Sequence, residues 1–439
     1  MTIKPRWLAL APDLSPLRGS PGFRSLYLAR SVSLLSIAIL AVTVAWQVYE
    51  LSGSSLHVAG VSVGLALGSL VGLLWGGTWA DRADRRRIMI GGRAAYVGVV
   101  LLLWGNSVQT EPDLIIIYLA TLLSGLTSGI SAPALMASLP RLVPPHQLAA
   151  AGALNALALE LGRLLGPLIA GLLLVRTGPA FSYGLALAGA VVVPLLLALI
   201  PKDALLPPAS QPSPPARPSL VKQWLEGFRY IRHHKVIACL LAIDLVAMLF
   251  VSIHVLIPQL GENVLAKGPE MVGYLYAAPA VGALLVAATS GWTRALSRPG
   301  RLIILATMIW GMAVLLAGVA ASRVSGDPEW ISWFVLGCFV VTGMADTATD
   351  IVRGAVLQQH TPDALRGRVS ALWLLQGYIG PALGGLQIAG LAALWSPARA
   401  LITGGGLCAG LIGAALAWPA SGFRGTFWRL GAAQDDRHP

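Results

Sequence analysis

Long apolar segments, separated by short polar ones, run through almost the whole chain. A membrane-spanning helix needs about 20 consecutive apolar residues, and twelve segments approach this length. We predict spans at residues 25–50, 58–80, 88–106, 114–139, 148–174, 181–200, 236–260, 270–293, 301–321, 330–355, 368–394 and 399–418. The pattern therefore predicts an all-α membrane protein with twelve transmembrane helices.

The composition narrows the class of protein further. Of the 439 residues, 56% are hydrophobic and 11% are charged, whereas soluble proteins average about 25% charged residues. This excludes a soluble enzyme and a disordered protein. The cysteines Cys239, Cys338 and Cys408 lie in apolar segments without paired spacing, so we expect no disulfide and no metal site. Motifs for ATP or zinc are also missing from the sequence, so we expect no cofactor and no enzymatic activity.

The basic residues indicate how the chain is oriented. The formal net charge is +12, and 26 of the 31 Lys and Arg, including Arg30, Arg93 and Arg353, lie on the side that holds the N-terminal tail, the loop after the second span and the central segment. Cytoplasmic loops of membrane proteins carry an excess of Lys and Arg. We therefore predict that both termini are cytoplasmic, and we expect the basicity to reflect topology and not nucleic-acid binding. No cleavable signal peptide is recognisable, so the first span is expected to act as a signal-anchor.

The centre of the chain differs from its two halves. Residues 201–218 are rich in proline and predict an extended linker. An amphipathic pattern follows, which predicts a helix on the inner membrane surface that tethers the halves; its apolar positions are Leu220, Val221, Trp224, Leu225, Phe228 and Ile231. We predict a cytoplasmic tail at 1–24, a six-helix bundle at 25–200, the linker and amphipathic helix at 201–235, a second bundle at 236–418 and a tail at 419–439.

An internal repeat relates the two bundles. The segment VPPHQLAAAGALN at 143–155 is similar to TPDALRGRVSALW at 361–373, and GRLLGPLIAG at 162–171 is similar to GYIGPALGG at 377–385. Both separations are about half of the chain. Two pseudo-symmetric six-helix bundles around a central cavity are typical of transporters built from parallel repeats.

The loop after the second span carries a family motif. GTWADRADRRR at 77–87 resembles the loop motif of the major facilitator superfamily, with Asp84 where that motif has glycine. The resemblance implies the major facilitator fold. It also implies that the motif latches the second span against the eleventh in one conformation; the residues concerned are Gly77, Asp81, Arg82, Arg85 and Arg86. An ordinary basic cytoplasmic loop is the alternative.

The fifth span carries a second motif of the same superfamily. Gly162, Gly166, Pro167 and Gly171 resemble its antiporter motif, with Ala170 in place of one glycine. The resemblance implies an exporter and a helix bent at the proline, whereas the alternative is simple close packing of helices. The fourth span lacks the arginine that many drug–proton antiporters of the superfamily carry.

A closer resemblance extends over residues 22–418. LARSVSLL at 28–35, WADRADRRRIMI at 79–90, GYLYAAPAVGALL at 273–285 and RGRVSALWLLQ at 366–376 are similar to siderophore exporters of the major facilitator superfamily. This implies export of a catecholate-type siderophore. Efflux of lipophilic drugs or macrolides is a second possibility, and a non-transporting scaffold or sensor is a third, from another class.

Ionisable residues within the spans are candidates for proton coupling, because charge is costly in the membrane interior. Asp244 lies near the middle of the seventh span without a basic residue within one turn, so we expect an unpaired carboxyl that can take up and release a proton. Asp346 and Asp350 share one face of the tenth span, and Asp350 can pair with Arg353 or Arg366. Glu160 in the fifth span can pair with Arg163, three residues later.

Other polar and aromatic residues are candidates for substrate binding. An aromatic substrate could stack on aromatic rings and hydrogen-bond to amides, although packing against lipid is the alternative for each ring. The candidates are Arg163, Gln376, Trp46, Gln47, Tyr276 and Trp373. Together these features predict a monomeric, proton-coupled exporter of a small organic molecule in the lipid bilayer of a bacterial cytoplasmic membrane.

Overall fold

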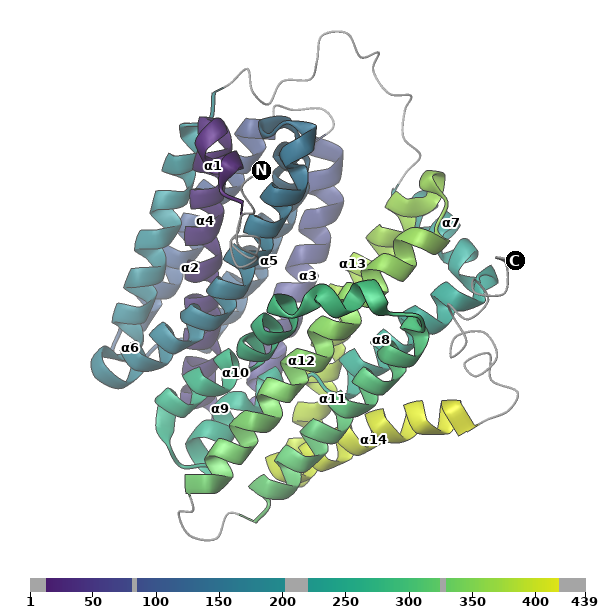
Figure 1. The fold of residues 1–439 in the computed structure, drawn as a ribbon. Helices are drawn as coiled ribbons and strands as arrows, with labels where there is room; N and C mark the ends of the chain where they lie inside the picture. The colour runs from purple at the N-terminus through teal and green to yellow at the C-terminus, as the bar shows by residue number, and fades with distance from the viewer. Residues whose placement is uncertain (1–12, 81–84, 202–219, 324–328, 418–439) are drawn as a thin grey trace, which may run out of the picture. The chain divides into compact units, whose positions relative to one another are not determined.

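The structure is a computed structural model that describes residues 13–80, 85–201, 220–323 and 329–417. Within these ranges every regular element is helical and no strand occurs (Figure 1). The prediction of an all-α protein is therefore confirmed. The predicted linker falls mostly on residues 202–219, which lie outside the described ranges.

The helices of the N-terminal half follow the predicted spans closely. A short helix, α1, precedes the first of them, and Asp113 caps α5 by accepting a 2.7 Å hydrogen bond from the backbone amide of Ile115. The elements are α1 (Ser15–Gly19), α2 (Pro21–Ser52), α3 (Ser55–Ala80), α4 (Arg85–Ser107), α5 (Leu114–Leu142), η2 (Pro145–Gln147) and α6 (Leu148–Ala198).

The C-terminal half begins with the predicted amphipathic helix and continues with further long apolar helices. The elements are α7 (Leu220–His233), α8 (Lys235–Phe250), η4 (Ile253–Leu256), α9 (Ile257–Gln259), η5 (Leu260–Val264), α10 (Gly268–Ala288), η6 (Ser290–Ala295), α11 (Pro299–Ala321), α12 (Glu329–His360), α13 (Asp363–Leu394) and α14 (Pro397–Ala417).

Among the described residues, 11 helices are long and apolar enough to cross a membrane. One of them includes α6, whose 51 residues would extend about 75 Å as a straight helix, more than twice the thickness of the hydrocarbon core. Gly178 interrupts α6 with φ 78° and ψ 179°, a conformation that glycine adopts without steric cost. Its two parts correspond to the predicted fifth and sixth spans, and the total of twelve spans stays a prediction.

The seventh predicted span, 236–260, is not one continuous α-helix. The α-helix α8 ends at Phe250, and η4, α9 and η5 continue the chain as short 3₁₀, α and π segments to Val264. Ser252 donates a short hydrogen bond to the carbonyl of Met248 at this break. Ser252, His254 and Pro258 interrupt the apolar pattern here, but hydrophobicity alone did not predict the change in helix type.

The described residues form two compact units. The first takes its residues from Met1–Ala41, Leu67–Gly166 and Thr177–Pro214, and the second from Val42–Ala66, Pro167–Arg176 and Pro215–Pro439. Two segments of the N-terminal half, 42–66 and 167–176, are thus grouped with the C-terminal half because they contact it. The predicted boundaries of the bundles remain a prediction.

The core of the first unit lies where α2, α5 and α6 meet. Phe23 and Leu26 of α2 are buried with Leu142 of α5 and with Leu154 and Leu197 of α6. Helix α4 packs against α5 along its length. This packing holds the first turns of α2 against α6, and a pocket lies between α2, α5 and α6.

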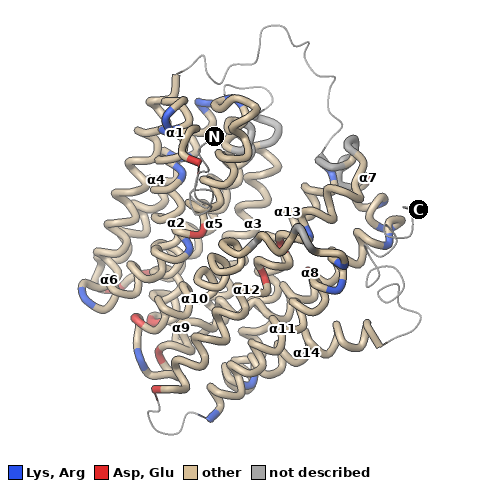
Figure 2. Tube along the Cα trace, viewed as in Figure 1, with Lys and Arg blue, Asp and Glu red and all other residues tan. Residues whose placement is uncertain are grey.

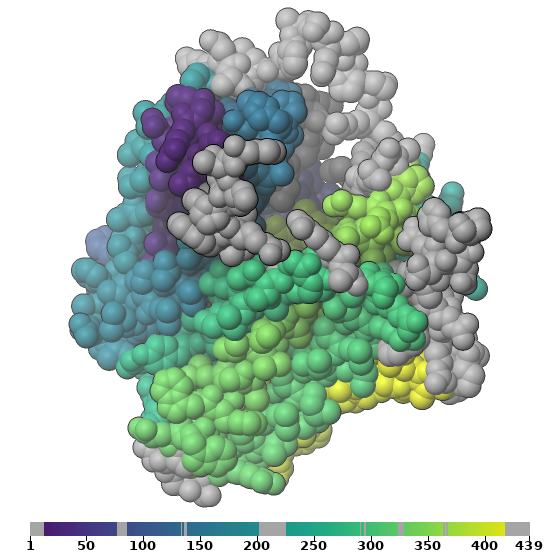
Figure 3. Space-filling model, viewed as in Figure 1, coloured from purple at the N-terminus to yellow at the C-terminus, as the bar shows by residue number. Residues whose placement is uncertain are grey.

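The second unit is held together by close approach of small residues. Helix α11 packs against both α12 and α14, and the yellow atoms of α14 lie directly against green atoms of the preceding helices in Figure 3. A Cβ atom at Gly311 would lie 2.9 Å from the backbone nitrogen of Ala409, and one at Gly318 would lie 2.7 Å from the carbonyl oxygen of Ala398. Small residues at these positions permit this helix contact within a membrane.

The amphipathic helix α7 packs against α13. Glu226 of α7 forms a 2.6 Å ion pair with Arg368 of α13. Leu225 and Phe228 are each 59% exposed, so α7 presents an apolar face away from the unit, as expected for a helix that lies on a membrane surface.

Substitution of two glycines of α13, Gly384 and Gly390, tests the packing at the break after α8. A Cβ atom at Gly384 would collide with the carbonyl oxygen of Met248, whereas one at Gly390 would meet nothing within 4 Å. We expect Gly384→Ala to lower stability by about 1–3 kcal/mol through overpacking, and the control Gly390→Ala to leave it unchanged or slightly higher. Thermal unfolding in detergent measures both. Equal stability of the two variants would contradict the contact.

Candidate functional site

A buried ion pair joins α8 and α12 in the second unit. The Nη1 atom of Arg353 lies 2.6 Å from Oδ1 of Asp244, and both side chains are 2% exposed. Such a pair must compensate the loss of hydration of both charges, which requires close contact and further hydrogen bonds. The surrounding residues provide them.

Helices α12 and α13 complete this centre. Arg353 also donates to Oδ1 of Asp350 at 3.0 Å and to the hydroxyl of Thr349 at 3.3 Å. From α13, Gln376 donates to Oδ2 of Asp244 at 3.0 Å and to the carbonyl of Leu241 at 3.1 Å. The side chain of Trp373, one turn before Gln376, also lies beside Asp244.

The charges of this centre do not balance. One guanidinium, that of Arg353, faces the carboxylates of Asp244 and Asp350, so the three side chains carry a formal charge of about −1 when both acids are ionised. Asp350 is 52% exposed and can be hydrated, whereas Asp244 depends on its protein partners. A proton added to the centre would make it neutral. Figure 2 shows that most of the length of the helices carries no charged residue, which makes this cluster distinctive.

One expectation about this centre is wrong. Asp244 is not unpaired, because Arg353 reaches it from α12, far away in the sequence. Helix α12 continues to His360 and buries the side chain of Arg353 two turns before its end. Of the two partners predicted for Asp350, Arg353 is observed at 3.0 Å.

The other candidate acids lie outside this centre. Asp346 is half-buried one turn before Asp350 on α12. In the first unit, Glu160 and Arg163 of α6 form the predicted pair at 3.4 Å, with Arg163 60% exposed and Glu160 17% exposed. The Oε2 atom of Glu160 is buried without a hydrogen bond among the described residues, so this pair leaves one oxygen available.

Three polar contacts connect the end of α2 and the start of α3 with the segment after α8. Nε1 of Trp46 donates to Glu262 at 2.7 Å, Ser55 donates to Gln259 at 2.7 Å, and Asn263 donates to the hydroxyl of Tyr49 at 2.7 Å. All six residues belong to the second unit. By the predicted orientation they lie at the outer ends of the helices, and we call them the outer contact cluster.

The remaining aromatic and amide candidates lie in more than two places. Trp46 is a member of the outer contact cluster, and its neighbour Gln47 is buried with 2% exposure. Tyr276 of α10 stacks on His254, with ring centroids 6.1 Å apart, and donates to the carbonyl of His254 at 2.8 Å. Gln376 and Trp373 adjoin Asp244. The structure therefore does not gather the predicted substrate-binding residues into one group.

The loop motif is only partly described. Asp81 and Arg82 lie outside the described residues, and the side chains of Gly77 and Arg85 are likewise not described. Arg86 donates from Nε to the carbonyl of Ile200 at 3.0 Å and from Nη2 to that of Ala198 at 2.6 Å. It thus caps the carboxyl end of α6, where basic groups are favourable. The predicted latch stays a prediction.

The antiporter-like motif packs α6 closely. A Cβ atom at Gly162 would lie 3.0 Å from Cβ of Leu34 in α2, and one at Gly166 would collide with Ala38. A Cβ atom at Gly171 would lie 2.9 Å from Cα of Gly273 in α10. The backbone stays helical through Pro167, since Gly178 is the non-helical residue within α6, so the motif produces close packing without a break at the proline.

Sequence reasoning missed a basic group in the first unit. Arg30 of α2 and Asn155 of α6 line a pocket of about 140 Å³ together with apolar residues of α2 and α5. Arg93 of α4 lies nearby and donates to the hydroxyl of Ser33 at 3.0 Å. Charge counting placed both arginines on the cytoplasmic side and did not indicate that Arg30 lines a pocket. The LARS sequence around Arg30 was the available signal.

Long apolar helices and a buried, charge-coupled centre are the features of a polytopic membrane transporter. A family model described as Major Facilitator Superfamily matches residues 26–385, and the chain belongs to this superfamily. It is therefore a transporter and not an enzyme, and the predicted resemblance is confirmed.

Curated relatives and solved structures agree with this assignment. The enterobactin exporter EntS of Shigella boydii serotype 18 is 35% identical over 410 residues, which cover 92% of each chain. EntS of Escherichia coli O157:H7 is 34% identical with the same coverage. A POT family transporter crystallised with 5-aminolevulinic acid has a TM-score of 0.75 at 14% identity, covering 91% of this chain and 96% of that one. The nucleoside transporter NupG has a TM-score of 0.67 at 12% identity, covering 90% and 98%. These two structures show the fold alone.

Proposed function

We propose that this transporter exports a catecholate-type siderophore from a bacterial cytoplasm and that the proton gradient drives the export. The substrate class is supported by the EntS relatives, which share 34–35% identity over 92% of the chain. The proposal includes a monomeric protein in the cytoplasmic membrane with both termini in the cytoplasm, and the distribution of Lys and Arg supports this orientation. Lipophilic drug efflux is the alternative that the experiment below separates.

The Asp244–Arg353 pair is the observation that carries the proposal of proton coupling. Two carboxylates share one guanidinium there, so the centre can accept one proton and become neutral. A proton on Asp244 would weaken the attraction between Asp244 and Arg353. Arg353 would then still have Asp350 as a partner. The centre therefore has two bonding arrangements that differ by one proton.

Alternating access couples this chemistry to transport. A ligand shifts a conformational equilibrium only by its difference in affinity for the two states. A proton binds Asp244 more tightly in the conformation in which the Asp244–Arg353 ion pair is loosened. Protonation of Asp244 therefore favours that conformation. Proton entry on one side and release on the other would drive substrate outward. Asp346, Asp350 and the Glu160–Arg163 pair are further proton-carrying candidates under this proposal, and the loop motif is the candidate latch.

The test uses the purified full chain in proteoliposomes. An imposed pH gradient should drive accumulation of enterobactin by the wild type. Asp244→Asn should abolish this accumulation but retain exchange of labelled for unlabelled substrate, because only the proton site is lost. Glu329→Gln, which removes an exposed acid in the first turn of α12, should behave like the wild type.

Two results would overturn parts of the proposal separately. Undiminished gradient-driven accumulation by Asp244→Asn would exclude Asp244 as the proton carrier. If the protein transports a lipophilic drug and does not transport enterobactin, the proposed substrate class is wrong. Proton coupling is then tested by gradient-driven accumulation of that drug in the Asp244→Asn variant.

A further inference from the structure

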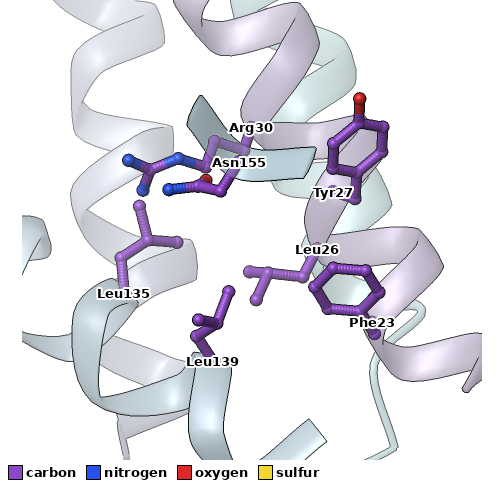
Figure 4. Close-up of a pocket in the computed structure, with 7 residues that line it drawn as sticks. All are labelled: Phe23, Leu26, Tyr27, Arg30, Leu135, Leu139 and Asn155. Atoms are coloured by element: carbon purple, nitrogen blue, oxygen red, sulfur yellow. The ribbon is translucent and has the colours of Figure 1, made fainter. Parts of the chain in front are cut away.

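A pocket in the first unit combines aromatic, apolar and cationic groups. It lies between α2, α5 and α6 and has a volume of about 140 Å³. Figure 4 shows the side chains of Arg30 and Asn155 extending beside each other on one side, with the rings of Phe23 and Tyr27 on the other. Leu135 and Leu139 of α5 close the floor of the pocket.

Among the described residues, the guanidinium of Arg30 has no partner of opposite charge. It lies about 14 Å along α2 from its first residue. Within the described parts of the chain it makes no ion pair, and its buried Nε atom has no hydrogen bond. An arginine in a membrane span is costly and normally pairs with an acid or lines a polar cavity. Arg30 lines a cavity whose other walls are mainly apolar, with Asn155 as a polar neighbour.

A second cation increases the local positive charge. Arg93 of α4 is close enough to Arg30 for the two guanidinium groups to repel each other. Its own hydrogen bond is to the neutral hydroxyl of Ser33, which does not offset the charge. Two neighbouring cations with no anion beside them in the described part of the chain are an unfavourable arrangement that a bound anion would relieve.

We propose that this pocket binds one anionic aryl group of the exported molecule, which is a ring that carries a carboxylate or an ionised phenol. This inference rests on the proposed function, since it assigns a place to part of the substrate. The planar guanidinium of Arg30 matches a carboxylate through two parallel hydrogen bonds. Asn155 supplies both a donor and an acceptor for a neighbouring hydroxyl.

The size of the pocket restricts its occupant to a single ring. A cavity of about 150 Å³ in another protein holds one benzene molecule, which is close to the volume found here. The rings of Phe23 and Tyr27, whose centroids are 6.2 Å apart, provide an aromatic wall for offset stacking. A lipid phosphate offers the same charge but no ring, so the experiment must distinguish these two sources of an anion.

The test measures binding to the full chain in nanodiscs of zwitterionic phosphatidylcholine. By isothermal titration calorimetry at neutral pH, 2,3-dihydroxybenzoate should bind the wild type more tightly than catechol, which has the same ring without the carboxylate. Arg30→Gln should weaken the binding of 2,3-dihydroxybenzoate at least about tenfold and leave that of catechol nearly unchanged. Arg24→Gln, at an exposed position of the same helix, is the matched control and should bind both probes like the wild type.

Thermal unfolding separates binding from a structural role. Because Arg30 makes no ion pair and repels Arg93, Arg30→Gln should be at least as stable as the wild type. A clear loss of stability together with equal weakening of both probes would overturn the proposal, since Arg30 would then support the fold. Displacement of 2,3-dihydroxybenzoate by phosphatidylglycerol, with lipid binding lost in Arg30→Gln and no preference for the benzoate over catechol, would also overturn it in favour of a lipid phosphate.

Failure of the site and failure of the proposed function give different results. If the wild type transports enterobactin and Arg30→Gln transports and binds equally well, the pocket is wrong and the function stands. If the wild type transports no catecholate but prefers 2,3-dihydroxybenzoate to catechol only when Arg30 is present, the proposed substrate is wrong. The pocket is then supported as a binding site for another aromatic anion.

Discussion

Replacement of Arg353 by glutamine should destabilise the protein by about 3–5 kcal/mol, which is the cost of leaving a buried charge without its partner. Asp244 is 2% exposed, so water cannot replace the missing guanidinium. The amide of Gln376 would remain as a hydrogen-bond donor, but it carries no charge. We therefore expect this variant to be the least stable single substitution in the centre.

Asp244→Asn should cost clearly less than Arg353→Gln. In that variant Arg353 keeps Asp350 as a partner at 3.0 Å, and the asparagine can still accept a hydrogen bond from Gln376. The double variant Asp244→Asn with Arg353→Gln should be more stable than Arg353→Gln alone, because neither side chain is then charged. The two single variants and the double variant form a cycle that isolates the pair.

Thermal and denaturant unfolding in detergent at several pH values tests this order. A proton supplied at low pH can neutralise the carboxyl that Arg353→Gln leaves unpaired, so the deficit of this variant should shrink between about pH 8 and about pH 5. If Asp244→Asn proves the less stable single variant, or if the double variant is no better than Arg353→Gln, the pair does not have the role described here.

The sequence was sufficient to predict the helices but not their partners. The apolar segments gave the spans to within a few residues, as in α3 at Ser55–Ala80 for the predicted 58–80. Burial of an apolar segment in lipid depends on local composition, so a local pattern is enough. The break after Phe250 was not predicted. Gly384 of α13 approaches Met248 at this break, and a local pattern does not reveal a contact between residues so far apart in sequence.

Contacts between candidate functional residues could likewise be predicted within one helix but not between helices. Asp350 with Arg353 and Glu160 with Arg163 are three residues apart on one helix, and both pairs were predicted from spacing alone. The contact of Asp244 with Arg353 joins two helices far apart in sequence, which no periodicity reveals. The pocket at Arg30 was not predicted, because the positive-inside rule counts basic residues near helix ends and does not indicate which of them face a pocket.

Removal of the outer contact cluster should open the outer ends of the helices. Trp46→Phe, Tyr49→Phe and Ser55→Ala delete three hydrogen bonds to Glu262, Asn263 and Gln259, each of which is 2.7 Å long. A net contribution of about 1 kcal/mol for each bond gives a total of about 3 kcal/mol. This corresponds to roughly a hundredfold rise in the equilibrium constant for opening.

Hydrogen exchange measured by mass spectrometry reports this opening directly. In the triple variant, exchange of amides in 46–55 and 257–264 should accelerate, while α11 and α14, which pack against each other, should exchange as in the wild type. Ser322→Ala deletes a 2.8 Å hydrogen bond to the carbonyl of Val319 within one helix end and should not affect either segment. If exchange in the triple variant is unchanged, apolar packing and not these polar contacts keeps the two segments together. Opening driven by protonation would then have to break contacts outside the outer contact cluster.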